Sequence, residues 1–182
     1  ELPHDYVSAL AEFLQNHPDY GAISGALIEQ FDGGFKETIS RKVTLPSLCW
    51  KFLFQLTVWA DLSTIQSSSF GRIVLNWVKT FYRNSNNTFT LAGWPLVTQV
   101  NGDHFRTAIF GLGAALVRRE WLVASPFDEI LDIHGIGDNY GVAINFPGDL
   151  PIVVLRTVSV SHHRSDINRL PATTAYYRRI LA

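Results

Sequence analysis

The sequence predicts one domain of the α/β class, and three observations lead to this prediction. First, 47% of the 182 residues are hydrophobic, which is enough to bury the core of a single domain. Second, apolar residues recur at helical spacing in residues 3–17 and again in residues 45–82. Third, residues 152–161 are rich in β-branched side chains, as is typical of a buried strand. The chain therefore combines helices with buried strands.

Composition excludes several classes of protein. A net charge of −1 without a basic tract argues against binding to nucleic-acid phosphates. The one cysteine, Cys49, excludes an internal disulfide and a cysteine zinc cluster, and it fits a reducing compartment. The longest apolar run, residues 48–60, is shorter than the roughly 20 residues that cross a bilayer. We therefore predict a cytoplasmic protein, either free or at the inner face of the membrane.

The first helix and the first strand are predicted from the spacing of apolar residues and from the positions of glycine and proline. Residues 3–17 are predicted to form a helix that ends before Pro18, because their apolar residues line one face. Residues 21–25 then lead into a buried strand at residues 26–30, which ends at Asp32-Gly33-Gly34. The chain opens at Glu1-Leu2-Pro3 without a signal peptide, which we interpret as an internal position of a longer chain.

Residues 45–82 are predicted to form two helices separated by a serine-rich break. Each helix carries an apolar stripe with several aromatic residues, and two interpretations are open. The simpler is that both stripes are core. The other is that they form an apolar surface that meets a membrane or a lipid-linked acceptor. The stripes consist of Trp50, Phe54, Val58 and Leu62, and of Phe70, Ile73, Val74, Trp77, Val78 and Phe81.

The second half carries further strands and helices. Short strands are predicted at residues 88–91 and 96–100, followed by a turn at residues 101–103. Between the two strands, Trp94 is either a core indole or an aromatic platform for a sugar. The remaining predictions are a glycine-rich strand at residues 110–116, a helix at 138–146, a strand at 152–161 and a surface helix at 166–181.

The order of motifs in residues 111–163 resembles the carboxy-terminal half of a family 2 glycosyltransferase of the GT-A fold. The matching pieces are Gly111-Leu112-Gly113, Arg118, Phe127-Asp128-Glu129, Gly137-Asp138-Asn139, and His162 or His163. The resemblance implies a mixed sheet flanked by helices. It also implies that residues 1–182 form one acceptor-side portion, since no Asp-x-Asp motif and no nucleotide-binding strands precede the first helix.

In that family a carboxylate at the Gly-Glu-Asp motif deprotonates the acceptor hydroxyl during an inverting transfer. Aligned on Gly137, the acidic pair becomes Asp138-Asn139, and an amide cannot accept the proton. Asp138 is therefore the predicted general base. The alternative is that Asp138 only caps the helix at residues 138–146.

The remaining candidates follow from the same resemblance. His162 or His163 is the predicted ligand of a divalent metal, Mn²⁺ or Mg²⁺. The alternative is an ordinary histidine that ends a strand and is hydrogen-bonded at the surface. Arg118 and Arg164 are expected to neutralise the leaving diphosphate, because guanidinium groups match phosphate oxygens. Asp128 and Glu129 are placed on the substrate side with Trp94, although capping of a short helix also explains both acids.

The predicted activity is transfer of a sugar from a UDP- or GDP-sugar to a saccharide or lipid-linked acceptor. It requires a donor half, which either upstream residues of a longer chain or a separate amino-terminal half would supply. A second hypothesis is a non-catalytic module that binds saccharide or supports a partner. A hydrolase using Asp128 and Asp138 is the third, and it lacks a nucleophile motif.

Overall fold

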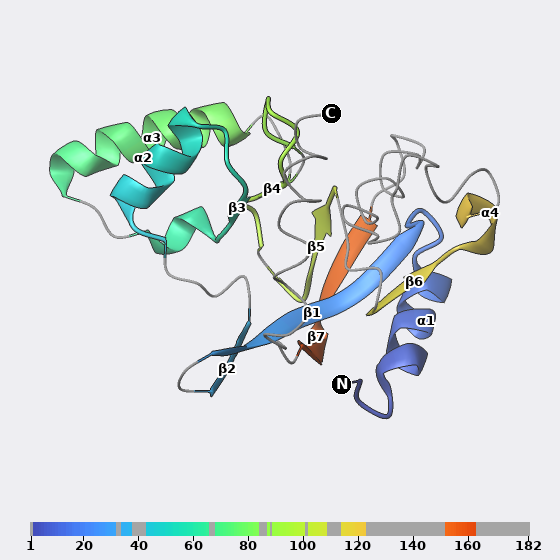
Figure 1. The fold of residues 1–182 in the computed structure, drawn as a ribbon. Coiled ribbons are helices and arrows are strands. Elements are labelled where there is room, and N and C mark those ends of the chain that lie inside the picture. Colours follow the sequence, from blue (N-terminus) through green and yellow to red (C-terminus); the bar gives the residue numbers. More distant parts are fainter. Residues whose placement is uncertain are drawn as a thin grey trace, which may run out of the picture.

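The computed structural model describes residues 2–31, 34–37, 43–65, 68–83, 87, 89–100, 102–108, 114–122 and 152–162. The described elements are α1 (Tyr6–Asn16), β1 (Ala22–Phe31), β2 (Gly34–Glu37), α2 (Leu45–Leu53), β3 (Val58–Trp59), a 3-10 helix (Leu62–Thr64), α3 (Ser69–Arg83), β4 (Leu96–Val97), β5 (His104–Thr107), β6 (Ala115–Val117), α4 (Arg119–Leu122) and β7 (Ile152–His162). They form a mixed α/β structure (Figure 1).

A mixed sheet organises the structure. Its strand order is β2-β1-β7-β5, and β6 also pairs with β1. β1 and β7 are parallel neighbours, whereas β2, β6 and β5 are antiparallel to the strands beside them. β6 pairs with the first residues of β1 and β2 with its last, so both occupy the same edge of β1. The predicted combination of a mixed sheet with helices is confirmed.

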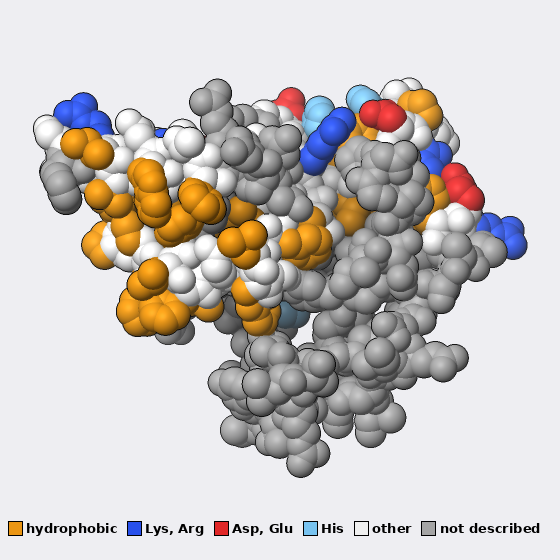
Figure 2. Space-filling model, turned by 90° about the horizontal axis from the view of Figure 1, so that it is seen from above, with side chains coloured by type: hydrophobic (Ala, Val, Ile, Leu, Met, Phe, Trp, Pro, Cys, Tyr) orange, Lys and Arg blue, Asp and Glu red, His pale blue; other side chains and the backbone are white. Residues whose placement is uncertain are grey.

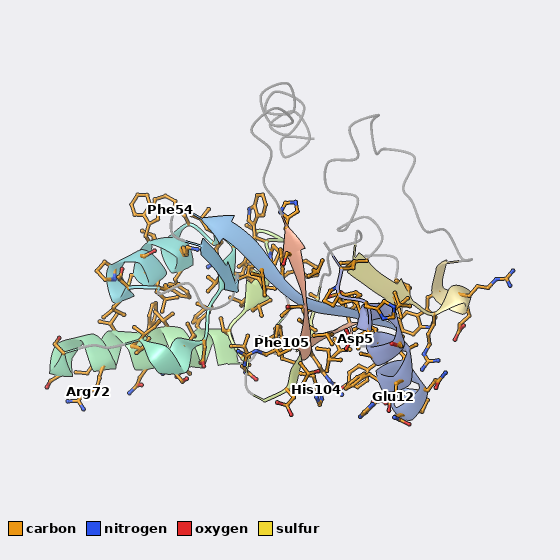
Figure 3. The ribbon with its side chains drawn as sticks, turned by 90° about the horizontal axis from the view of Figure 1, so that it is seen from below. Asp5, Glu12, Phe54, Arg72, His104 and Phe105 are labelled. Atoms are coloured by element: carbon orange, nitrogen blue, oxygen red, sulfur yellow. The ribbon has the colours of Figure 1, made fainter. Side chains whose placement is uncertain are left out.

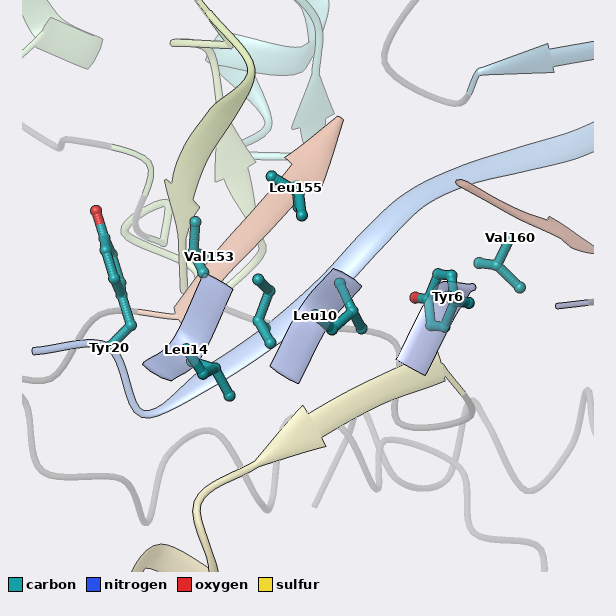
Figure 4. Packing of buried hydrophobic residues seen from close by; sticks show 8 residues of the cluster. Tyr6, Leu10, Leu14, Tyr20, Val153, Leu155 and Val160 are labelled. Carbon is teal, nitrogen blue, oxygen red and sulfur yellow. The ribbon is translucent and has the colours of Figure 1, made fainter. Parts of the chain in front are cut away.

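Helix α1 covers one face of this sheet. Its buried stripe, Tyr6, Leu10 and Leu14, packs in one cluster with residues of β1 and β7 (Figure 4). The helix predicted at residues 3–17 is thus confirmed, with ends that differ by a few residues. The strand predicted at residues 26–30 begins earlier, at Ala22, because Ala22 to Ser24 pair with β6 on one side and β7 on the other. Small residues that we expected to lead into the strand belong to it.

The opposite face of the sheet packs against β3, β4 and the residues that follow β4. Val97, Val100 and Phe105 form a buried cluster with Val154, and Trp59 packs against it. Val154 therefore faces away from α1, whereas its neighbours Val153 and Leu155 face α1. Both faces of β7 are buried at this point, which confirms the strand predicted at residues 152–161 and explains its β-branched composition.

A lobe formed by α2 and α3 lies beside the sheet (Figure 1). The Thr44 side chain caps α2 by accepting a bond from the Ser47 N–H at 3.4 Å. At its end, Gln55 adopts a φ of +52°, and the Leu56 N–H donates to the Lys51 carbonyl at 2.8 Å. This Schellman motif stops the helix. Both predicted helices are confirmed, but Val58 and Leu62, which we placed on the first stripe, lie beyond α2.

The interpretation of the stripes as core is confirmed for the buried Val58, Leu62 and Val78 and is wrong for five other members. Trp50, Phe54, Ile73, Trp77 and Phe81 have between 51% and 67% of their surface exposed. The lobe's core is made by other residues, which include Leu48, Leu75 and Val78. Each helix therefore has two neighbouring apolar stripes, and the packing between α2, α3, β3 and β4 buries only one of them.

The remaining strand predictions are confirmed only in part. The strand predicted at residues 88–91 is a single bridge between Phe89 and Pro95, and the strand predicted at residues 96–100 is the two-residue β4. Of the glycine-rich strand predicted at residues 110–116, the structure describes the end, where β6 begins at Ala115. The helices predicted at residues 138–146 and 166–181 lie outside the described residues.

Candidate functional site

The amino end of α1 and the carboxyl end of β7 meet at one edge of the sheet (Figure 1). Tyr6, the first residue of α1, packs in the same cluster as Val160, two residues before the last residue of β7 (Figure 4). Because β1 and β7 are parallel, this is also the edge where both strands end. In open α/β sheets, ligands bind outside the carboxyl ends of the parallel strands.

His162 is the predicted site residue that the structure places at this edge. Its side chain is exposed, and its Cα pairs with that of Glu29 near the end of β1. Val158 and Val160 both pack in the cluster on the α1 side. Since successive side chains of a strand alternate between faces, His162 belongs to the same face, toward the start of α1. His163 lies outside the described residues.

The Tyr6 hydroxyl fixes the geometry of this edge. It accepts a hydrogen bond from the Gly25 N–H at 2.7 Å and donates one to the Ala114 carbonyl at 2.6 Å. The register between β1 and β7 shifts between Gly25 and Ala26, so the bond occurs at an irregularity of the ladder. A Cβ at Gly25 would lie 2.6 Å from the Tyr6 ring. Burial raises the pKa of the Tyr6 phenol above its ordinary value, and the bond from Gly25 opposes this rise.

Arg118 lies at the other end of α1. Its Nε donates to the Tyr20 carbonyl at 2.7 Å, and a terminal nitrogen donates to the carbonyls of Leu14 at 2.7 Å and His17 at 3.4 Å. These acceptors surround the end of α1, so the guanidinium satisfies carbonyls that the helix leaves unpaired. The structure does not bring Arg118 together with His162. Its predicted contact with a diphosphate stays a prediction.

Trp94 occupies a tight turn outside the mixed sheet. The Thr90 N–H donates to the Trp94 carbonyl at 2.7 Å, and the Trp94 N–H donates to the Thr90 hydroxyl at 3.1 Å. Gly93 has a φ of +79°, which only glycine adopts readily. The indole is half-buried beside β4, which pairs with β3 in a separate two-stranded sheet.

The other predicted site residues lie outside the described residues: Asp138, Asp128, Glu129, Arg164 and His163. Their roles stay predictions. Within the described ranges, no three or more His, Cys, Asp or Glu side chains gather into a group that could hold a metal ion. Among these residues, His162 is therefore not part of such a group, and it can serve as one ligand of a site whose other ligands come from elsewhere.

An aromatic cluster at the far end of α1 was not predicted. The rings of Phe13 and His17 stack with centroids 4.1 Å apart, and His104 meets the Phe13 ring edge-on at 5.1 Å. The Arg106 guanidinium lies 5.7 Å from the centre of the Tyr20 ring. Sequence spacing gives no signal for this cluster, because α1 and β5 are far apart in the chain. Its stacking and cation–π contacts hold the helix end against the sheet.

Asn87 is a second residue that the sequence did not identify. Its buried side-chain amide donates to the carbonyls of Gln99 at 2.5 Å and Arg106 at 2.8 Å. Its amide oxygen accepts from the N–H groups of Thr98 at 2.8 Å and Gln99 at 2.9 Å. The residue has a φ of +55°, which asparagine tolerates better than most residues. One side chain thus joins the segment after β4 to β5.

Comparison of the chain with models of known protein families, with curated protein sequences and with solved structures found no match. In the part of the chain that the structure describes, no helix is both long and apolar enough to cross a membrane.

Proposed function

We propose that this chain is the acceptor-side portion of an inverting glycosyltransferase of the GT-A type. It would transfer a sugar from a UDP- or GDP-sugar to the hydroxyl group of a saccharide or lipid-linked acceptor. The proposal rests on the order of motifs and on one structural observation, the meeting of the amino end of α1 with the carboxyl end of β7.

This observation matters because of what the resembled enzymes place at those two points. In that family, the Asp-x-Asp motif that holds the metal and the diphosphate lies shortly before a helix. The helix that ends near His17-Pro18, followed by the strand β1, resembles that passage. A histidine that ends a late strand reaches the same metal. Here the start of α1 and His162 share one edge and one face of the sheet. A metal held upstream of α1 would therefore lie on the side of the sheet to which His162 belongs.

The His162 imidazole can bind a divalent metal of the Mn²⁺ or Mg²⁺ class only together with further metal ligands. An exposed neutral imidazole is one suitable ligand for Mn²⁺. The carboxylates that hard cations prefer would come from an Asp-x-Asp motif, which residues 1–182 do not contain. When bound, the metal supplies positive charge that stabilises the leaving diphosphate.

The remaining roles follow from the chemistry of the side chains. Asp138 accepts the proton of the acceptor hydroxyl as that oxygen attacks the anomeric carbon. Arg164 donates hydrogen bonds to the departing diphosphate. Asp128 and Glu129 lie on the substrate side, and Trp94 offers an aromatic face to the acceptor. For Arg118 we favour the contact that the structure contains, which is the end of α1. The proposed location is the cytoplasm, at the inner face of the membrane.

A non-catalytic saccharide-binding module of the same ancestry is the second candidate. It is favoured by Asn139, an amide in the place of the family's second acid. In this case, sugar binding would persist without transfer, and Asp138 would only cap a helix.

The experiment that separates the two uses the native protein with the residues encoded upstream of Glu1. Isothermal titration with UDP- and GDP-sugars is carried out with and without Mn²⁺. We expect Mn²⁺-dependent donor binding that weakens roughly tenfold or more in His162→Ala, because loss of a ligand costs at least as much as loss of a group that orients one. His104→Ala is the matched control, since His104 is also exposed but lies at the far end of α1.

Asp138→Asn tests the chemical step. This variant should retain donor affinity and lose transfer, since the amide cannot accept the proton. Unchanged turnover in Asp138→Asn would remove Asp138 from the role of base. Equal donor binding in wild type and His162→Ala would remove the imidazole from the metal site. A folded protein that binds saccharide but no donor would support the non-catalytic module instead.

A further inference from the structure

One side of the α2–α3 lobe presents a large apolar surface. Figure 2 shows hydrophobic side chains gathered over this lobe. We call this surface the aromatic face. It consists of side chains that are between 51% and 71% exposed, namely Trp50, Leu53, Phe54, Ile73, Trp77 and Phe81. Exposed apolar patches of this kind on a folded protein mark sites of interaction with another molecule.

The aromatic face is continuous across the two helices. Ile73, Trp77 and Phe81 follow one another at a spacing of four residues and so lie on one side of α3. The half-buried ring of Phe52, on α2, contacts both Trp77 and Phe81, with centroids 5.1 Å and 5.2 Å away. Leu53 follows Phe52 in the chain, and the Trp50 and Phe54 rings lie 4.2 Å apart. Ring contacts thus join Phe52, Trp77 and Phe81 across the two helices, and Trp50 and Phe54 form a second pair at the end of α2.

The core of the lobe does not require this surface. Gly71, Leu75 and Val78 form the buried side of α3, and Leu48 is the fully buried residue of α2. The exposed stripe of Ile73, Trp77 and Phe81 lies next to this buried side of α3. The large aromatic residues therefore occupy positions where the fold would accept polar ones.

Charge indicates what the aromatic face meets. Residues 43–83 contain four basic residues, Lys51, Arg72, Lys79 and Arg83, against the single acid Asp61, which gives this segment a net charge of +3. The whole chain carries −1, so the rest carries −4. Arg72 and Lys79 lie on the polar side of α3, across the helix from the stripe of Ile73, Trp77 and Phe81. In Figure 3, Arg72 and Phe54 are on opposite sides of the lobe.

We propose that the aromatic face lies in the headgroup region of an anionic lipid membrane. Helices that rest in this region combine tryptophan, phenylalanine and leucine on one side with lysine and arginine on the other, as α3 does. Indole and phenyl rings enter the boundary between headgroups and acyl chains, and the basic side chains reach the lipid phosphates. The net charge of +3 argues against a second copy of the same face, since like charges would be brought together. This inference is independent of the proposed sugar transfer.

The test is sedimentation of the whole chain with vesicles of phosphatidylcholine, alone or mixed with phosphatidylglycerol. We expect binding to the mixed vesicles that weakens as salt is raised, together with a blue shift of tryptophan fluorescence. The double variant Trp50→Ala with Trp77→Ala should lower the affinity at least tenfold, because the buried apolar area is lost. The double variant Arg72→Glu with Lys79→Glu should lower it roughly tenfold.

Matched controls come from the other side of the molecule. Val7→Ala removes an exposed apolar residue of α1, and Arg119→Glu reverses an exposed charge of α4. Neither should change vesicle binding. Absence of binding to mixed vesicles, or equal losses in the controls and the double variants, would overturn the proposal. So would self-association of the wild type, measured by ultracentrifugation without lipid, that Trp50→Ala with Trp77→Ala abolishes.

Discussion

Helices α1 and α3 have similar apolar patterns and opposite surroundings. On α1, Tyr6, Leu10 and Leu14 recur every four residues and are 2%, 0% and 8% exposed. On α3, Ile73, Trp77 and Phe81 recur at the same spacing and are 67%, 58% and 54% exposed. The repeat of four residues predicts a helix with an apolar side in both cases. Only the neighbours of that side decide whether it becomes core.

The burial of the two stripes differs because a sheet covers more of the surface of a helix than one other helix does. α1 lies against β1, β6 and β7, whose side chains form a broad apolar surface. α3 meets α2 along one stripe, with β3 and β4 beyond it. The Phe52 ring of α2 contacts two rings of the exposed stripe of α3, but among the described residues no broad apolar surface covers that stripe.

Leu10→Ala should have the largest effect on stability. The side chain is fully buried between α1 and the sheet, and its truncation should cost about 2–5 kcal/mol in free energy of unfolding. Urea unfolding followed by circular dichroism measures this loss. Val7→Ala, on the exposed side of the same helix, serves as the control. A cost for Leu10→Ala as small as that of Val7→Ala would contradict the described packing of α1.

Asn87→Ala tests the connection between the segment after β4 and the sheet. The variant leaves buried carbonyl and N–H groups without partners, so we expect a loss of about 1–3 kcal/mol in free energy of unfolding. Gln99→Ala is the matched control, because it removes an exposed amide while the backbone of residue 99 keeps its bonds. Equal stability of the two variants would show that the Asn87 amide does not make these bonds in solution.

Tyr6→Phe should cost about 1–2 kcal/mol, because Gly25 and Ala114 each lose a hydrogen-bonding partner. The raised pKa of Tyr6 also makes stability depend on pH. The unfolded chain releases the phenol proton at a pH near 10, whereas the folded chain retains it to a higher pH. Stability is therefore complete below about pH 10 and falls as pH rises through the folded pKa.

Unfolding of wild type and Tyr6→Phe between neutral and alkaline pH checks this sign. The variant should lose less stability above about pH 10 than the wild type does. Parallel slopes for the two proteins would mean that another group causes the alkaline loss.

Ile73→Ala should have the smallest effect, no more than about 0.5 kcal/mol, because the side chain lies on the exposed stripe of α3. Val78→Ala on the buried side of the same helix is the partner measurement and should cost clearly more. If Ile73→Ala destabilised the protein as much as Val78→Ala, the aromatic face would be core, and the membrane proposal would fail with it.

The sequence suggested His162 or His163 through the resemblance, because in that family a histidine ends a late strand. The structure describes His162 at the end of β7, and its role as a metal ligand stays a prediction. Asn87 and Tyr6 were not identified as connectors, because their partners are backbone groups distant in the chain. The sequence also did not identify a carbonyl group at the end of α1 as the partner of Arg118. For Asp138, Asp128, Glu129, Arg164 and His163, the prediction stands without a structural description.

The sequence by itself determined the α/β class, the extent of α1 to within a few residues, the two helices of the lobe and the strand at residues 152–161. These are local properties, since periodicity and β-branching act on the backbone within one element. Only the tertiary structure decided that α1 is covered and the outer stripe of α3 is not, and that the start of α1 meets the end of β7. Burial and proximity depend on segments far apart in the chain, and no pattern within one segment encodes them.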